Sequence, residues 1–211
     1  MNKKEEFLNM MNFRHACKVF NETKKINDED MHYILDVARV SPSSFGMEAW
    51  KFLVITNEEL KAKLKPFCWN QVQITSCSHL VIVLAGIENL KVESGVVESQ
   101  LMRRNLPKDK LEAFIELYAS HLGNTLNSDE NIYQWSARQT YIASANMMNA
   151  AASIGIDSCP IEGFEKDNVE KVLDLDTKKY QVAMVLPFGY RLNEQPAKFR
   201  SKFEDVVEFI K

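Results

Sequence analysis

The sequence predicts a single α+β domain spanning residues 1–211, and three observations support this fold class. Helical and strand-like patterns are interspersed, but the helices lie unevenly between few strands, unlike the regular alternation of a doubly wound sheet. No repeat and no linker rich in Gly, Ser or Pro divides the chain. Hydrophobic residues make up 45% of the sequence, which is enough to form one large core.

The first half of the chain is expected to contain two helices and two strands. Asn27 favours a helix start, and apolar residues recur at helical spacing to about residue 40. The hydroxyl-rich segment 41–46 then forms a loop. Strands are expected at 51–55 and 79–85, with a short helix from 57 to about 66 between them.

The second half is expected to contain the longest helix, from about 129 to 153, ending at Gly155. This helix is rich in Ala and Met nearly all round, so it lies in the core or against a partner chain. Before it, the charged segment 98–121 is helical but broken at 106–107, as a surface excursion or mobile lid would be.

A short helix at 169–173 and a further strand at 180–186 complete the predicted domain. The C-terminal residues form a basic turn at 198–200, followed by an amphipathic or extended tail.

Composition excludes several classes of protein. The net charge is −3 and the pI is near 5.9, and no basic stripe is long enough to follow a nucleic-acid backbone. The longest apolar run, 80–87, is far shorter than the ~20 residues that cross a bilayer. The acidic N-terminal segment resembles no export signal, so we expect a cytoplasmic protein with four reduced cysteines. The scattered cysteines and histidines predict no metal site.

The stretch FRHACKVF at 13–20 is the strongest candidate for a functional segment. In an extended conformation, Arg14 and Lys18 lie on one face and Cys17 lies on the other. Arginine and lysine suit an anion such as phosphate, and Lys198 with Arg200 provides a second basic pair. The alternative is an ordinary solvated basic turn.

Five segments together resemble the FMN-dependent, oxygen-insensitive NAD(P)H nitroreductases. They are RHACK at 14–18, SPSSFGMEAW at 41–50, Asn70 within WNQVQ, PIEGF at 160–164 and KFR at 198–200. The resemblance extends from Arg14 to the C-terminal tail, and IDSCPIEGF is similar to the branch that activates nitroimidazole drugs. It implies a mainly antiparallel sheet between helices, and a homodimer in which a C-terminal extension embraces the other subunit.

The resemblance also implies four groups of FMN-binding residues. Those at the ribityl-phosphate end are Arg14, His15, Ala16, Lys198 and Arg200. Those at the pyrimidine side are Lys18, Asn70 and Gln73. Those on the other face of the ring are Pro160, Ile161, Glu162 and Gly163. Those from the partner subunit are Pro42, Ser43, Ser44 and Gly46.

The chain departs from the family pattern at three of these positions. Ala16 stands where Ser is common, Gly46 where Asn is common, and Gln73 where a second Lys is common. Each departure loses a hydrogen-bond donor, which predicts weaker FMN binding and a lower flavin potential. Cys159 is expected either to pack in the core or to contact the flavin.

The expected activity is two-electron transfer from NADH or NADPH to a small electron acceptor such as a nitroaromatic or a quinone. Because one flavin face serves both substrates, a ping-pong mechanism is expected, with no side-chain nucleophile or general base. The alternatives are a flavin-dependent dehalogenase, a pterin or flavin reductase, and a non-catalytic FMN-binding module.

Overall fold

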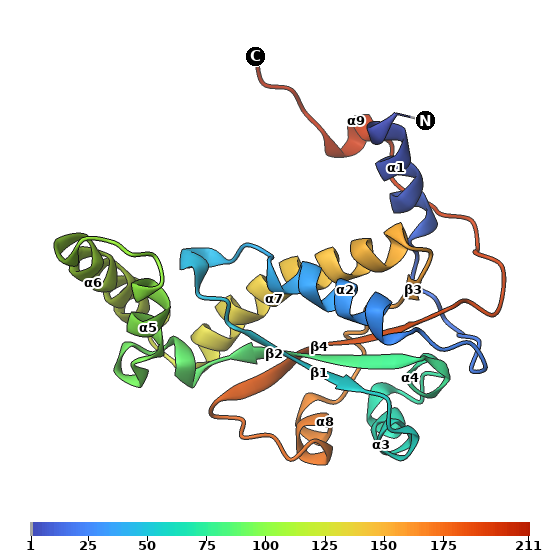
Figure 1. Ribbon diagram of the computed structural model, residues 1–211, viewed down its shortest axis with the longest axis horizontal. Coiled ribbons are helices and arrows are strands. Elements are labelled where there is room, and N and C mark those ends of the chain that lie inside the picture. The colour runs from blue at the N-terminus through green and yellow to red at the C-terminus, as the bar shows by residue number, and fades with distance from the viewer. Residues whose placement is uncertain (1) are drawn as a thin grey trace.

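The computed structural model describes residues 2–211, so that Met1 of the predicted domain lies outside it. It contains a four-stranded antiparallel sheet with helices on both faces (Figure 1). The strands, in their order across the sheet, are β1 Trp50–Ile55, β2 His79–Gly86, β4 Tyr180–Gly189 and β3 Asp157–Ser158. This arrangement confirms the predicted α+β class with a mainly antiparallel sheet.

The central strand β2 shows why the sheet is buried on both faces. Every residue of β2 is buried. Leu80, Ile82 and Leu84 belong to one core cluster, whereas Val81 and Val83 belong to another. Successive side chains of a strand point to opposite faces, so an unbroken apolar run is what a sheet covered on both sides requires.

Two long helices cover one face of the sheet. They are α2 Asp28–Arg39 and α7 Asp129–Ser153. Asn27 and Ser128 cap them by accepting backbone N–H groups. Gly155, with φ +75°, follows the end of α7 as predicted. α7 belongs to the core, although Tyr141 on its surface remains exposed.

Three short helices cover the opposite face: α3 Glu58–Leu64, α4 Gln73–Ser76 and α8 Lys166–Val172. A 3₁₀ helix, Lys65–Cys68, follows α3. Sequence patterns predicted α3 and α8, but missed α4 and the two-residue β3. The predicted end of the last strand at 186 was also wrong, because β4 continues through Pro187 to Gly189.

The charged segment after β2 forms a surface excursion, as predicted. It contains two short 3₁₀ helices, Glu88–Leu90 and Val92–Ser94, followed by α5 Val96–Met102 and α6 Lys108–Thr125. These elements lie at one end of the molecule in Figure 1. Tyr118 is fully buried there and donates its hydroxyl to Leu90 O at 2.7 Å. It belongs to a core cluster that the excursion shares with Met47 and with Trp135 of α7.

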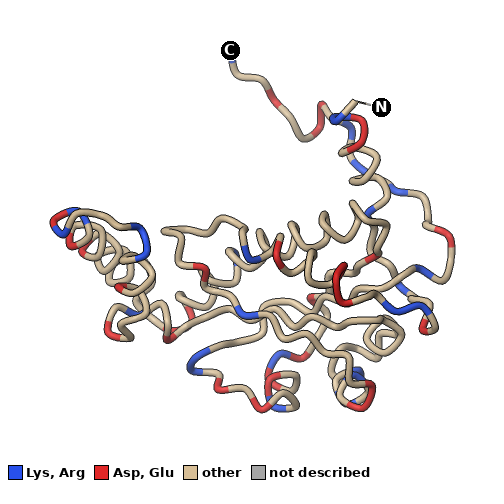
Figure 2. Tube along the Cα trace, viewed as in Figure 1, with Lys and Arg blue, Asp and Glu red and all other residues tan. Residues whose placement is uncertain are grey.

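Both ends of the chain extend from this body (Figure 1). The N-terminal helix α1, Lys3–Phe13, has no buried residue, and Phe7 and Leu8 are exposed. The C-terminal tail contains the short helix α9, Phe203–Val206, and several exposed apolar side chains, including Phe209 and Ile210. Lys and Arg residues are interspersed with Asp and Glu over the trace (Figure 2).

Candidate functional site

The basic N-terminal segment runs in an extended conformation beside β3 and the end of β4. Ala16 bridges Ser158 in parallel, and Phe20 bridges Arg191 in antiparallel orientation. Cys17 N donates to Ser158 O at 3.0 Å. Cys17 is buried whereas Ala16 and Lys18 are exposed, so the predicted alternation of faces is confirmed.

Three cations converge where this segment meets the C-terminal one. The pKa of Lys198 is lowered, first by burial and then by the positive charges of Arg14 and Arg200. Across residues 2–211 no ion pair within 4.0 Å involves any of the three. Three cations this close together, with no acidic side chain among these residues paired to them, form a positive patch that would attract an anion.

A second group of polar atoms surrounds the thiol of Cys159. The sulfur lies 3.9 Å from Lys18 Nζ and 3.9 Å from Gln73 Nε2. Burial raises the pKa of this thiol, and the positive charge of Lys18 opposes the increase. The structure therefore brings Lys18 and Gln73, which the resemblance assigned to the flavin, together at the sulfur of Cys159. Cys159 is fully buried, in agreement with the expectation that it packs in the core.

Gln71, which sequence reasoning did not single out, connects this group to the loop 160–163. Gln73 Nε2 donates to Gln71 Oε1 at 2.8 Å, and Gln71 Nε2 donates to Gly163 O at 3.0 Å. Ile161 exchanges two backbone hydrogen bonds with Val185 and so fixes the loop to β4. Pro160 lies between this pairing and Cys159.

Two exposed residues lie near this loop. Glu162 is exposed and accepts a hydrogen bond from the Tyr141 hydroxyl at 2.6 Å. Trp69 is 68% exposed. Its backbone and that of Asn70 both have φ 53°, a left-handed conformation that no sequence signal predicted.

The indole of Trp69 lies directly against Gly163. A Cβ atom built on Gly163 would lie 2.6 Å from Trp69 Cε3 and Cζ3, so the close approach requires glycine at this position.

The loop containing Pro42, Ser43, Ser44 and Gly46 follows the C-terminal end of α2, and α1 lies toward the other end of that helix (Figure 1). The Gln139 side chain of α7 accepts the Ser44 N–H at 2.9 Å, and Ser43 Oγ accepts the Glu48 N–H at 2.9 Å. One chain therefore does not bring this group to the cation cluster.

Two further residues, Asp157 and Arg191, lie behind the cation cluster and were missed from sequence. They form a bidentate ion pair in which the Asp157 side chain is 3% exposed. His15 Nδ1 lies 3.6 Å from Asp157 Oδ1 and has no hydrogen-bond partner. The pKa of His15 is lowered, first by burial and then by the positive charge of Arg191.

Comparison with known proteins agrees with this fold. The model of the nitroreductase family matches residues 11–190. The chain is 38% identical to the candidate NAD(P)H nitroreductase YfkO of Bacillus subtilis, covering 98% of each chain. It is 40% identical to the candidate NAD(P)H nitroreductase SH0546 of Staphylococcus haemolyticus, again covering 98% of each.

Solved structures show the same fold. A candidate NAD(P)H:FMN oxidoreductase from Staphylococcus epidermidis superposes with a TM-score of 0.83 at 25% identity, over 97% of this chain and 95% of that one. A candidate nitroreductase from Exiguobacterium sibiricum in complex with FMN has a TM-score of 0.82 at 24% identity, over 96% of each chain. The fold is thus that of the nitroreductases, and the chain belongs to the nitroreductase family.

Within residues 2–211, no helix has the length and apolar character needed to cross a membrane. The same residues contain no cluster of three or more His, Cys, Asp or Glu that could hold a metal ion.

Proposed function

We propose that this protein is an FMN-dependent oxidoreductase. It transfers two electrons from NADH or NADPH to nitroaromatics, quinones or related electrophiles by a ping-pong mechanism. The observation that carries the proposal is the placement of two groups beside the extended segment 14–18. The cations Arg14, Lys198 and Arg200 gather at one end, and the polar atoms around Cys159 gather at the other. The names of the relatives support the same activity.

The residues present suit FMN. A phosphate carries about −2 and is best held by arginine and lysine, which matches three cations without a counter-ion. Two buried polar atoms also lack hydrogen-bond partners: His15 Nδ1 and Ser158 Oγ. They belong to the segments on either side of the Ala16–Ser158 bridge, where a ribityl chain with its hydroxyls could satisfy them.

Bound FMN would accept a hydride from the nicotinamide and pass it to the acceptor. In this assignment Arg14, Lys198 and Arg200 hold the phosphate. Lys18 would be placed near the N1–O2 edge, where a cation favours the reduced flavin. The backbone of Gly163 would face the ring, and Gln71, which donates to Gly163 O, would help to orient it.

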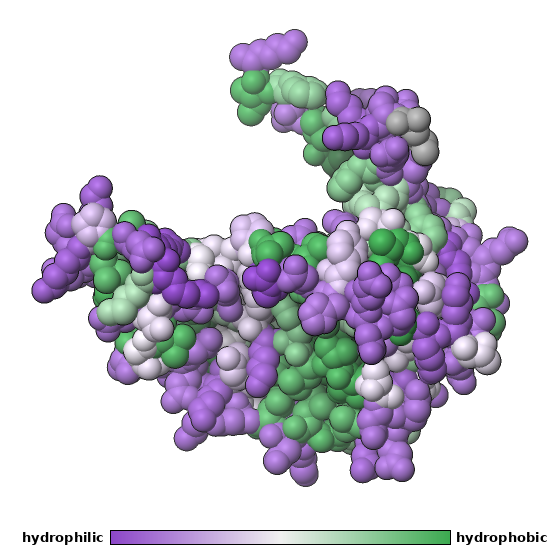
Figure 3. Space-filling view, viewed as in Figure 1, coloured by the Kyte–Doolittle hydropathy of each residue, from purple (hydrophilic) through white to green (hydrophobic). Residues whose placement is uncertain are grey.

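The active form in this proposal is a homodimer. In this proposal a second copy supplies the loop 42–46, because within one chain this loop lies at the C-terminal end of α2, away from α1 and the segment that follows it. β1 lies at the edge of the sheet, and a cavity of about 420 Å³ beside it is lined partly by Trp50, Phe52 and Val54. Apolar surface is visible in this region (Figure 3). The exposed apolar tail of a partner has the composition to cover it.

The test uses the purified full-length chain. It should purify as a yellow dimer that contains two FMN molecules. Addition of NADH or NADPH under argon should bleach the visible absorbance band of the flavin. The Arg200→Ala variant should bind FMN roughly 10- to 150-fold more weakly, because a hydrogen bond to a charged group contributes about 1.5–3 kcal/mol.

Lys202→Ala, which removes an exposed cation two residues away, is the control. A colourless monomer, or an Arg200→Ala variant with normal FMN affinity, would contradict the assignment. FMN binding without bleaching would instead favour the non-catalytic flavin module. Bleaching with no reduction of nitro compounds or quinones would favour a dehalogenase or a pterin or flavin reductase.

A further inference from the structure

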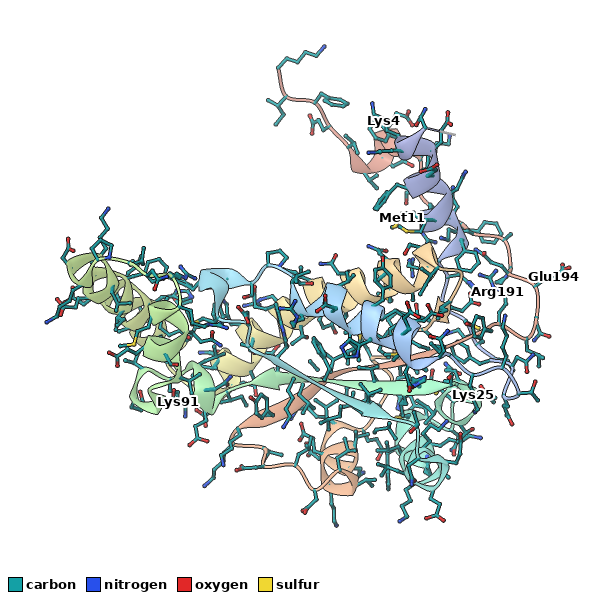
Figure 4. The ribbon with its side chains drawn as sticks, in the orientation of Figure 1. Lys4, Met11, Lys25, Lys91, Arg191 and Glu194 are labelled. Carbon is teal, nitrogen blue, oxygen red and sulfur yellow. The ribbon has the colours of Figure 1, made fainter. Side chains whose placement is uncertain are left out.

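The C-terminal end of α1 is held by three side chains from the segment 191–198. The last carbonyls of a helix have no partner within the helix, and the last turn of α1 contains no basic residue of its own. Arg191 Nη2 donates to Phe13 O at 3.3 Å, and Gln195 Nε2 donates to Asn12 O at 2.9 Å. Lys198 Nζ donates to Met11 O at 2.6 Å and also to Arg14 O. Figure 4 labels Met11 and Arg191 on the two segments.

Arg191 is the centre of these contacts. Its guanidinium holds Asp157 through Nε at 2.9 Å and Nη2 at 2.6 Å, while its backbone N–H donates to Asp157 Oδ2 at 2.9 Å. Its Nη1 donates to Gln195 Oε1 at 3.1 Å, and its plane lies 4.2 Å from the centre of the Phe13 ring. One side chain thus connects β3, the end of α1 and the C-terminal segment.

The same contacts leave one N–H donor of the Lys198 ammonium group for a ligand. An ammonium group has three N–H donors, and two of those on Lys198 are used on Met11 O and Arg14 O. The third remains to be donated. Because Lys198 binds the carbonyl of Arg14 itself, the two cations keep a fixed separation only while α1 and the segment 191–198 stay in register.

We propose that Arg191 is a positioning residue for the phosphate of the flavin nucleotide. It acts through Asp157, Gln195 and the end of α1, and it fixes the separation of Arg14 from Lys198. The inference rests on the proposed function, since it assumes that these cations bind FMN phosphate. Its consequence is selectivity: the Arg191 contacts matter for FMN, but not for riboflavin, which has no phosphate.

A purely structural ion pair would behave differently. Removing one partner of a buried pair leaves an uncompensated charge and destabilises the whole protein. Such a loss of stability would weaken the binding of FMN and of riboflavin to the same extent. The test therefore compares the dissociation constants of FMN and riboflavin for the full-length protein freed of flavin.

Two variants remove different parts of these contacts. Arg191→Lys keeps a cation for Asp157 but loses the planar fork that also reaches Phe13 O and Gln195. Gln195→Ala removes a half-buried amide, so the variant should fold even if Arg191→Lys does not. The matched control is Lys166→Met, which removes the cation from another buried ion pair, the one with Glu170. The two pairs are similarly buried: the side chains of Lys166 and Glu170 are 31% and 5% exposed. Those of Arg191 and Asp157 are 23% and 3% exposed.

We expect Arg191→Lys to weaken FMN binding about tenfold or more, and Gln195→Ala about threefold, as loss of charged and neutral hydrogen bonds predicts. Riboflavin binding should be unchanged in both. Lys166→Met should lower thermal stability without altering the preference for FMN over riboflavin.

Two results would overturn the proposal, and they are distinguishable. If the wild-type protein prefers FMN but both variants keep that preference, or lose both flavins equally, Arg191 is structural only. If the wild-type protein binds riboflavin as tightly as FMN, the phosphate site of the proposed function fails, and the positioning role fails with it.

Discussion

The ammonium nitrogen of Lys18 lies 3.9 Å from the sulfur of Cys159, which is 141 residues away in the sequence. Cys159 is fully buried, and burial raises the pKa of its thiol, so the sulfur stays protonated at neutral pH. Lys18 itself is exposed on the outer face of the extended segment. The pair therefore combines an accessible positive charge with a neutral, polarisable group beneath it.

Lys18 should control the potential of the flavin. Lys18→Met should lower the midpoint potential by about 30–60 mV, because 30 mV corresponds to about 1.4 kcal/mol for two electrons. Reduction by NADH or NADPH should slow, with little change in FMN affinity. Conversely, Gln73→Lys should raise the potential by adding a second cation. Lys24→Met, which removes a cation stacked on Tyr190, is the control. Unchanged potentials in both test variants would remove this charge from the mechanism.

Substitution of Cys159 separates packing from contact with the reacting groups. Cys159→Ala removes the atom that touches Lys18 and Gln73, whereas Cys159→Ser keeps a small polar atom near both. If the sulfur contacts the flavin or the acceptor, the two variants should differ from the wild type in flavin spectrum or nitroimidazole reduction, while remaining folded dimers. Loss of thermal stability alone, with normal spectra and turnover, would make Cys159 a packing residue.

Gly163→Ala should displace the Trp69 indole. The new methyl would lie 2.6 Å from two ring atoms, and relieving such an overlap costs about 1–3 kcal/mol. The expected result is a lower melting temperature and a change in tryptophan emission. In a Trp69→Leu background the same substitution should cost much less. An equal cost in both backgrounds would place the strain in the backbone of Gly163 instead.

Thermal stability should fall as the pH falls from 7 to 5, partly because of His15 and His79. The pKa of His79 is lowered from 6.5, first by burial and then by Lys61 and Lys25, with Asp28 opposing. As the pH falls below 6.5, the imidazole takes up a proton in the unfolded chain before it does so in the folded chain. The free energy of unfolding therefore decreases with falling pH until the lowered pKa of the folded state is reached. Melting temperatures of His79→Asn should depend less on pH in this range. An identical pH profile in that variant would exclude His79 as a cause.

The elements that could be predicted from sequence are those with a local pattern. The apolar run at 80–85 predicted a buried strand, which β2 confirms, and Asn27 with periodic apolar residues predicted α2. α4 and β3 were missed because four and two residues are too short to show a period. Assignment of the cation cluster depended on the family resemblance, since the charges of residues 14 and 198 show no pattern connecting them.

The parts of the site that could not be predicted depend on contacts across the chain. Nothing near Asp157 or Arg191 in the sequence indicates that the two side chains pair across 34 positions. Asparagine tolerates the left-handed backbone found at Asn70, but tryptophan usually avoids it. At Trp69 this conformation therefore reflects tertiary packing of the indole against Gly163 rather than local preference. Gln71 was overlooked because its role lies only in connecting Gln73 to that glycine.

The hydrogen bond from Gln195 to Asn12 spans 183 positions of the chain. A ribosome adds about 5–20 residues per second, so α1 emerges roughly 10–40 s before the side chains that hold its C-terminal end. During that interval the nascent chain has its first basic segment but not its second. The three cations that the proposed function assigns to the phosphate can therefore come together only after residues 191–198 have been synthesised.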